Sequence, residues 1–140
     1  MSTDWLAGLP DPARDTGQRA HDLVAAAMPA GYAKTLAPGM ATWAVPLARY
    51  PDTYNRQPLA YVMLAARKTG CALYLMGIYQ DPDREARLRR AYADAGMKID
   101  LGKSCLRFKR FEQLHADAVA REIASLGVDA FIAHHEAARG

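Results

Sequence analysis

The chain has 140 residues, of which 51% are hydrophobic and 24% are charged. This length and balance are typical of one globular domain, so we expect a single domain over residues 1–140. No apolar run approaches the roughly 20 residues that a transmembrane helix needs, which excludes a membrane-spanning protein. The net charge of +3 permits an acidic partner. Nucleic acid is not expected, because the chain lacks clustered basic residues with aromatic residues between them.

The N-terminus and the cysteines indicate the compartment. Residues 1–5 lack the basic and then apolar pattern of a secretion signal, so we expect a cytoplasmic protein. Cys71 and Cys105 lie far apart in the sequence and form neither a metal knuckle nor a CxxC motif. We therefore predict two free, buried thiols rather than a disulfide.

Helical spacing of apolar residues predicts a first helix over residues 12–28, with Asp11 as its N-cap and a proline at its first position. A short strand follows at residues 40–45, with Trp43 as its apolar anchor. Residues 46–58 are rich in aromatic, amide and turn residues. This segment is either a packed connection or the rim of a pocket.

Two apolar runs, residues 59–65 and 71–78, are joined by a short segment that ends in glycine. This pattern predicts a hairpin. Because both runs are apolar on both faces, we expect central strands that are covered on at least part of each face. Asp81 then caps a helix whose first turn is acidic, as the helix dipole favours.

Residues 103–109 alternate between apolar and basic side chains, which predicts a strand near an edge of the sheet. Leu106 and Phe108 are expected to face the core. The opposite face would carry Lys103, Cys105, Arg107 and Lys109.

The Gly102-Lys103-Ser104 triplet invites comparison with a phosphate-binding loop. That motif needs a glycine where this chain has Met97, and it needs a helix after the serine. A strand follows instead, so the sequence does not predict a phosphate loop.

The C-terminal third is expected to be helical. A helical turn is predicted at residues 111–115, and Asp117 is expected to cap a helix that ends at Gly127. A last helix follows from residue 129. His134 and its neighbour in sequence point about 100° apart on a helix, which makes them poor joint ligands for one metal ion.

A dispersed set of residues carries a likeness to a known family. The set is Trp5-Leu6, Leu9-Pro10, Pro29-Ala30-Gly31-Tyr32, Gly39-Met40, Trp43, Val45-Pro46-Leu47, Tyr50-Pro51, Tyr54-Asn55, Gln57-Pro58-Leu59, Lys68, Ala72-Leu73-Tyr74-Leu75-Met76, Asp81-Pro82, Asp100-Leu101-Gly102-Lys103-Ser104-Cys105 and Arg107-Phe108-Lys109. With these residues the chain resembles the YdhG-like family of bacterial domains, some of which are described as frataxin-like intracellular iron chaperones.

The resemblance implies a small α+β domain in which an antiparallel sheet is packed by N-terminal, middle and C-terminal helices. It implies no recognised catalytic machinery, and it makes iron a possible cargo. Relatives tend to carry acidic residues just after the Pro-Ala-Gly-Tyr turn, where this chain has Ala33-Lys34. Two positions that would face iron are lost, at this site and at Gly70.

The basic strand favours a different ligand, because a hard cation such as iron needs clustered carboxylates. Arg107 is suited to a bidentate contact with a carboxylate or phosphate, and aromatic rings would supply apolar walls. The alternative is that Arg107 pairs with Asp100 for structural reasons. The candidate ligand-binding residues are Trp43, Tyr54, Gln57, Tyr74, Lys103, Cys105 and Arg107.

Three function classes remain. We expect a non-catalytic binding protein, either an iron chaperone by resemblance or a binder of a small anionic ligand or acidic protein surface. An enzyme is the third class, and it would need an exposed, nucleophilic Cys105. The sequence shows no catalytic triad, carboxylate pair or zinc-ligand spacing, so no catalytic or metal-binding residue is assigned.

Overall fold

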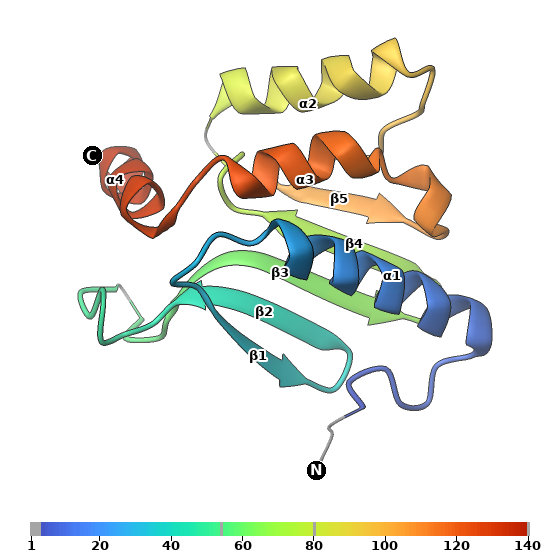
Figure 1. Cartoon of the computed structure of the whole chain (residues 1–140), viewed down its shortest axis with the longest axis horizontal. Helices are drawn as coiled ribbons and strands as arrows, with labels where there is room; N and C mark the ends of the chain where they lie inside the picture. The colour runs from blue at the N-terminus through green and yellow to red at the C-terminus, as the bar shows by residue number, and fades with distance from the viewer. Residues whose placement is uncertain (1–3, 54, 80, 140) are drawn as a thin grey trace.

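An antiparallel sheet of five strands runs through the molecule in chain order, as Figure 1 shows. The computed structural model describes residues 4–53, 55–79 and 81–139. The elements are α1 (Asp11–Ala27), β1 (Ala33–Ala37), β2 (Met40–Val45), β3 (Leu59–Arg67), β4 (Gly70–Leu75), α2 (Pro82–Asp94), β5 (Cys105–Phe108), the 3₁₀ turn η1 (Phe111–Gln113), α3 (Ala116–Ala124) and α4 (Val128–Arg139). The expected α+β fold with an antiparallel sheet is confirmed.

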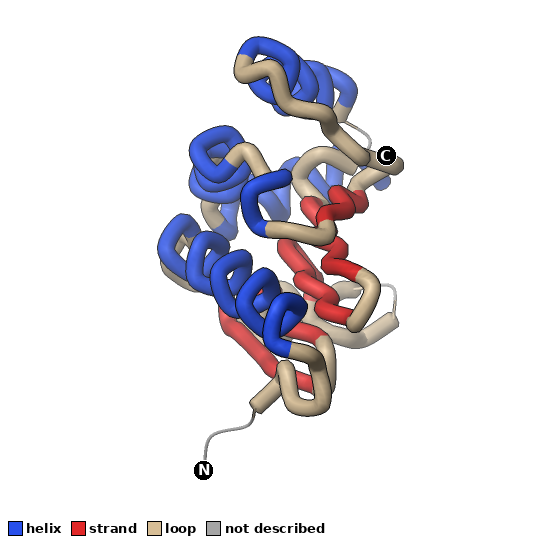
Figure 2. Tube along the Cα trace, turned by 90° about the vertical axis from the view of Figure 1, so that its right-hand side faces the viewer, coloured by secondary structure: helices blue, strands red, loops and turns tan. Residues whose placement is uncertain are grey.

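The core lies between the sheet and the helices. Leu64, Leu73 and Leu106 are paired across β3, β4 and β5, and each is at most 1% exposed. Side chains that are paired in this way point to the same face. Phe108 is also buried, so the alternation expected for the basic strand is confirmed. In Figure 2 the helical layer lies to one side of the strands.

The two faces of the sheet differ in cover. Buried and half-buried residues alternate along β4. Ala72 and Tyr74 are among the half-buried ones, so they point away from the core face. Arg107, which is paired with Ala72, is exposed. The expectation that the β4 run is covered on at least part of each face is therefore met, since its outer face is half-buried. No helix among the described residues is long and apolar enough to cross a membrane.

Several boundaries differ from the sequence-based expectations. The first helix begins at Asp11 itself, so Pro10 is its N-cap and provides no side-chain bond. The second apolar run leaves the sheet after Leu75 and forms a turn, in which the Ile78 N–H donates to the Leu75 carbonyl oxygen. The Asp81 cap is confirmed, because its carboxylate accepts a hydrogen bond from the Arg84 N–H at 3.2 Å.

The expected Asp117 cap is wrong. His115 is the N-cap of α3, and its Nδ1 accepts a hydrogen bond from the Ala118 N–H at 3.1 Å. An imidazole nitrogen can replace the usual carboxylate or hydroxyl oxygen here, because the cap needs only an acceptor in reach of the first turn. The last helix begins at Val128, one residue earlier than expected.

Candidate functional site

A groove lies at the β5 edge of the sheet, with a volume of about 690 Å³. We call it the cationic groove. The side chains that give it its character are Arg67, Tyr74, Lys98, Asp100, Arg107 and Lys109. They come from the end of β3, from β4, from the segment before β5, and from β5 and the residue after it.

Backbone pairing brings these residues together. Arg107 is paired with Ala72 of β4, and Tyr74 is paired with Cys105, so Tyr74 and Arg107 share one face. The Arg107 N–H donates to the Asp100 carbonyl oxygen at 2.9 Å, which holds the preceding segment beside β5. Lys98 thus reaches the same groove from the outer side of the strand.

The groove concentrates positive charge. Four cationic side chains line it against one carboxylate, so its net charge of +3 equals that of the whole chain. The charges of the remaining residues therefore cancel. All four cations are exposed, which leaves their charges hydrated and available to an incoming anion.

The expected pairing of Arg107 with Asp100 is present but weak. Arg107 Nη1 lies 3.5 Å from Asp100 Oδ1, and the two side chains are 60% and 66% exposed. Exposed pairs of this kind contribute only about 0.2–1 kcal/mol, so an anionic ligand can replace Asp100 at small cost. This geometry is compatible both with a structural pair between Arg107 and Asp100 and with an Arg107 that binds an anionic ligand.

The structure brings together only some of the candidate residues named from the sequence. Tyr74 and Arg107 line the cationic groove. Cys105 is half-buried beside Tyr74, and Lys103 is exposed in the turn before β5; neither lines the groove. Sequence reasoning missed Arg67 and Lys98, which only the strand register and the fold of the segment before β5 bring to the site.

The other candidates lie elsewhere. Trp43 is 3% exposed in the core, with its ring 5.5 Å from that of His21, so it is not available to a ligand. Tyr54 lies outside the described residues. Gln57 lines a different cavity of about 570 Å³, which we call the neutral pocket. This cavity is bounded by Thr53, Asn55, residues 57–60 and Met63, by the turn after β4 and by one face of α4.

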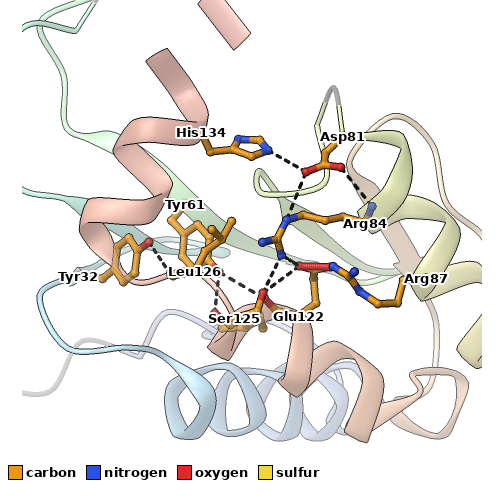
Figure 3. Close-up of polar contacts among 10 residues, drawn as sticks. Tyr32, Tyr61, Asp81, Arg84, Arg87, Glu122, Ser125, Leu126 and His134 are labelled. Carbon is orange, nitrogen blue, oxygen red and sulfur yellow. Dashed lines mark hydrogen bonds and ion pairs between the residues drawn. The ribbon is translucent and has the colours of Figure 1, made fainter. Parts of the chain in front are cut away.

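Figure 3 shows a polar cluster among the helices, and one of its members, His134, also lines the neutral pocket. Arg84 of α2 lies between two carboxylates: its Nε is 3.3 Å from Asp81 Oδ2, and its Nη1 donates to Glu122 of α3. Ser125 accepts a further bond from Arg84 at 2.7 Å. On α4, His134 Nε2 lies 3.2 Å from Asp81 Oδ2. The cluster thus joins α2, α3 and α4.

The ionisation of Asp81 indicates that the cluster has a structural role. Burial acts to raise the pKa of Asp81, but hydrogen bonds from the Arg84 N–H and from His134, with their charges, hold it below its ordinary value. Asp81 is therefore ionised and acts as an acceptor for both partners. Arg84 and His134 both contact this carboxylate, and Arg84 also bonds to Glu122 and Ser125, so the cluster holds the three helices together.

The two thiols are free, and they differ in burial. Burial raises the pKa of the Cys71 thiol to about 11, so it is protonated at neutral pH. Cys105 is half-buried, so the predicted burial of both thiols is correct only for Cys71. A nucleophilic role for Cys105 would need an adjacent base, and His21, His115 and His134 bond to other residues.

Within residues 4–53, 55–79 and 81–139, no group of three His, Cys, Asp or Glu side chains is placed to hold a metal ion. Comparisons of the chain with family models, with curated proteins and with solved structures find no match. Function must therefore be argued from the site itself.

Proposed function

We propose that this protein is a non-catalytic binding protein that holds a small anionic ligand, a carboxylate or phosphate compound, in the cationic groove. The observation that supports the proposal is the concentration of charge, since the groove carries a net charge equal to that of the entire chain. Arg107 can donate two parallel hydrogen bonds to a carboxylate or phosphate, and Arg67 and the two lysines add further donors. Tyr74 supplies an apolar wall for the body of the ligand.

Amide chemical shifts of ¹⁵N-labelled protein, titrated with citrate and separately with pyrophosphate, test this proposal. We expect saturable shifts at Arg67, Tyr74 and Arg107, which lie on three different strands. The double variant Arg107→Ala, Lys109→Ala should weaken binding by tenfold or more, because each charge-assisted hydrogen bond contributes about 1.5–3 kcal/mol.

The matched control is Arg90→Ala, Arg121→Ala. This variant removes the same amount of charge from exposed positions on α2 and α3 that do not line the groove. We expect it to bind as the parent does. Equal weakening in both double variants would show a nonspecific effect of net charge and would overturn the proposal. Binding of polyglutamate without binding of either small anion would instead indicate an acidic protein partner.

The resemblance to the YdhG-like family supports a second proposal, an iron chaperone. It rests on the resemblance alone, since the groove is cationic and a hard cation needs oxygen ligands that carry negative charge. Native mass spectrometry after anaerobic addition of ferrous iron tests it. Stoichiometric iron on both the parent and the Arg107→Ala, Lys109→Ala variant would favour the chaperone, while anion binding that the variant loses would favour the groove.

A further inference from the structure

The neutral pocket is built largely by one face of α4. Phe131, His134, His135 and Ala138 follow the helical spacing of i, i+3, i+4 and i+7, and all four line the cavity. The start of β3 and the turn after β4 form the opposite wall. The volume of about 570 Å³ lies within the range of pockets that hold small molecules.

The lining contains two histidines, and both contact other residues: His134 Nε2 lies 3.2 Å from Asp81 Oδ2, and the His135 ring packs edge-on against Tyr50. No described residue of the pocket wall is Asp, Glu, Lys or Arg, in contrast to the cationic groove. An ionised ligand would lose its hydration here without meeting a Lys, Arg, Asp or Glu side chain, and His134 is already bonded to Asp81, so burial of the ligand's charge is costly. The pocket therefore favours an uncharged molecule.

The apolar part of the pocket wall can adapt its shape and can pack against an aromatic ring of a ligand. Met63 and Met76 contribute flexible thioethers, which make favourable contacts with aromatic groups. Phe131 contributes an aromatic ring that is itself held in place, since its centroid lies 4.8 Å from that of Tyr61. A rigid ring next to mobile methionine side chains allows ligands of differing shape to pack.

The mouth of the pocket offers amide groups. Thr53 Oγ1 donates to the Gln57 carbonyl oxygen at 2.8 Å, and Asn55 Oδ1 accepts from the Gln57 N–H at 3.1 Å. These bonds fix the loop through its backbone and leave the exposed Gln57 side-chain amide at the rim. An amide there can donate to, or accept from, a single polar group on a ligand.

We propose that the neutral pocket binds an uncharged, mainly apolar ring compound that carries one hydroxyl or carbonyl group. The ring packs between α4 and the two methionines, and the polar group meets Gln57 at the mouth. This site is separate from the cationic groove, because the two cavities share no lining residue. It does not depend on the function proposed for that groove.

Protein labelled with ¹³C at the methionine methyl groups tests the proposal. The probes are benzyl alcohol and benzoate, which have the same ring and differ in charge. We expect benzyl alcohol to shift the Met63 and Met76 signals saturably, while Met28 and Met97, which lie outside the pocket, stay unchanged. Benzoate should bind at these methionines at least tenfold more weakly. An absence of shifts with benzyl alcohol, or equal binding of benzoate, overturns the proposal.

Two phenylalanine substitutions on α4 give a matched pair. Ala138 is exposed and lines the pocket, whereas Ala133 is exposed and does not. Ala138→Phe should fill the mouth and weaken benzyl alcohol binding tenfold or more, and Ala133→Phe should leave it unchanged. Equal binding by the parent and Ala138→Phe contradicts the proposed site. If Ala138→Phe unfolds, Ala60→Leu blocks the same cavity from β3, with the same expected outcome.

Discussion

At the scale of single residues, Glu122 has the most demanding environment. It is the only charged residue that is buried in the described part of the chain, and its side chain is 7% exposed. Its partner Arg84 is 17% exposed. Burial of a lone charge is far more costly than burial of a pair. The packing of α2 on α3 therefore depends on both members being present.

Removal of one member should cost more stability than removal of both. We expect Glu122→Ala to lower the free energy of unfolding by about 2 kcal/mol, because the largely buried Arg84 then keeps only Asp81 as a carboxylate partner. The double variant Arg84→Met, Glu122→Leu should recover most of this loss, since both charges are replaced by apolar groups of similar volume. Urea unfolding followed by circular dichroism measures the free energy of unfolding of both variants.

An exposed ion pair provides the control for this prediction. Glu85 bonds to Arg89 at 2.9 Å, with side chains 36% and 43% exposed. Glu85→Ala should therefore cost less than about 1 kcal/mol. Equal losses for Glu85→Ala and Glu122→Ala would show that burial of the pair is not what makes Glu122 important.

At the scale of elements, Asp81 links two helices through one carboxylate. It caps α2 and also contacts His134 of α4. Its pKa is lowered in the folded protein, so its ionised form favours folding. This contribution is fully present above the ordinary Asp pKa of about 4. It is lost as the pH falls through the lowered pKa of the folded state.

Asp81→Asn removes the negative charge and keeps the helix N-cap, because asparagine caps helices as well as aspartate does. We expect the variant to be less stable than the parent by about 1 kcal/mol at pH 5, and the difference should close as the pH falls through the acid range. Free energies of unfolding measured from about pH 5 to about pH 2 test this. Asp83→Asn, at an exposed position of the same helix, is the control. Parallel curves for the parent and Asp81→Asn would contradict the role of the charge.

The sequence predicted the elements that show an alternating apolar pattern or a common N-cap residue. It did not predict the elements or caps that lack these signals. The strand β5 followed from the alternation around Leu106, and α2 followed from its Asp81 cap. The strand β1 was missed, because all five of its residues are exposed and its pairing with β2 is not visible in an apolar pattern. The α3 cap was missed because His115 is an uncommon acceptor at that position.

At the scale of the whole molecule, the site was harder to predict than the fold. Arg107 and Tyr74 could be placed on strands from the sequence, but only the register shows that they share a face. Arg67 lies before the β3–β4 turn and Lys98 in the segment before β5, and neither belongs to the alternating pattern that placed Arg107. The basic residues are dispersed along the sequence, and the fold of the sheet brings four of them together in the cationic groove.

Ligand binding in the two cavities should differ in its sensitivity to salt, because one cavity attracts ligands by charge and the other by apolar burial. Pyrophosphate at about 100 times its dissociation constant stabilises the folded state by about 2.7 kcal/mol. We expect this to raise Tm by roughly 5–10 °C in dilute buffer. Most of the increase should vanish near 1 M NaCl, where the Debye length falls to about 3 Å. Stabilisation by benzyl alcohol should persist, since burial of an uncharged ring is not screened.

Differential scanning calorimetry of the parent and the Arg107→Ala, Lys109→Ala variant measures both effects. The variant should lose at least about half of the response to pyrophosphate and keep the response to benzyl alcohol, because the altered residues line only the cationic groove. A pyrophosphate effect that is unchanged near 1 M NaCl would mean that exposed charge does not hold the anion. A loss of both responses in the variant would mean that the cavities are not independent.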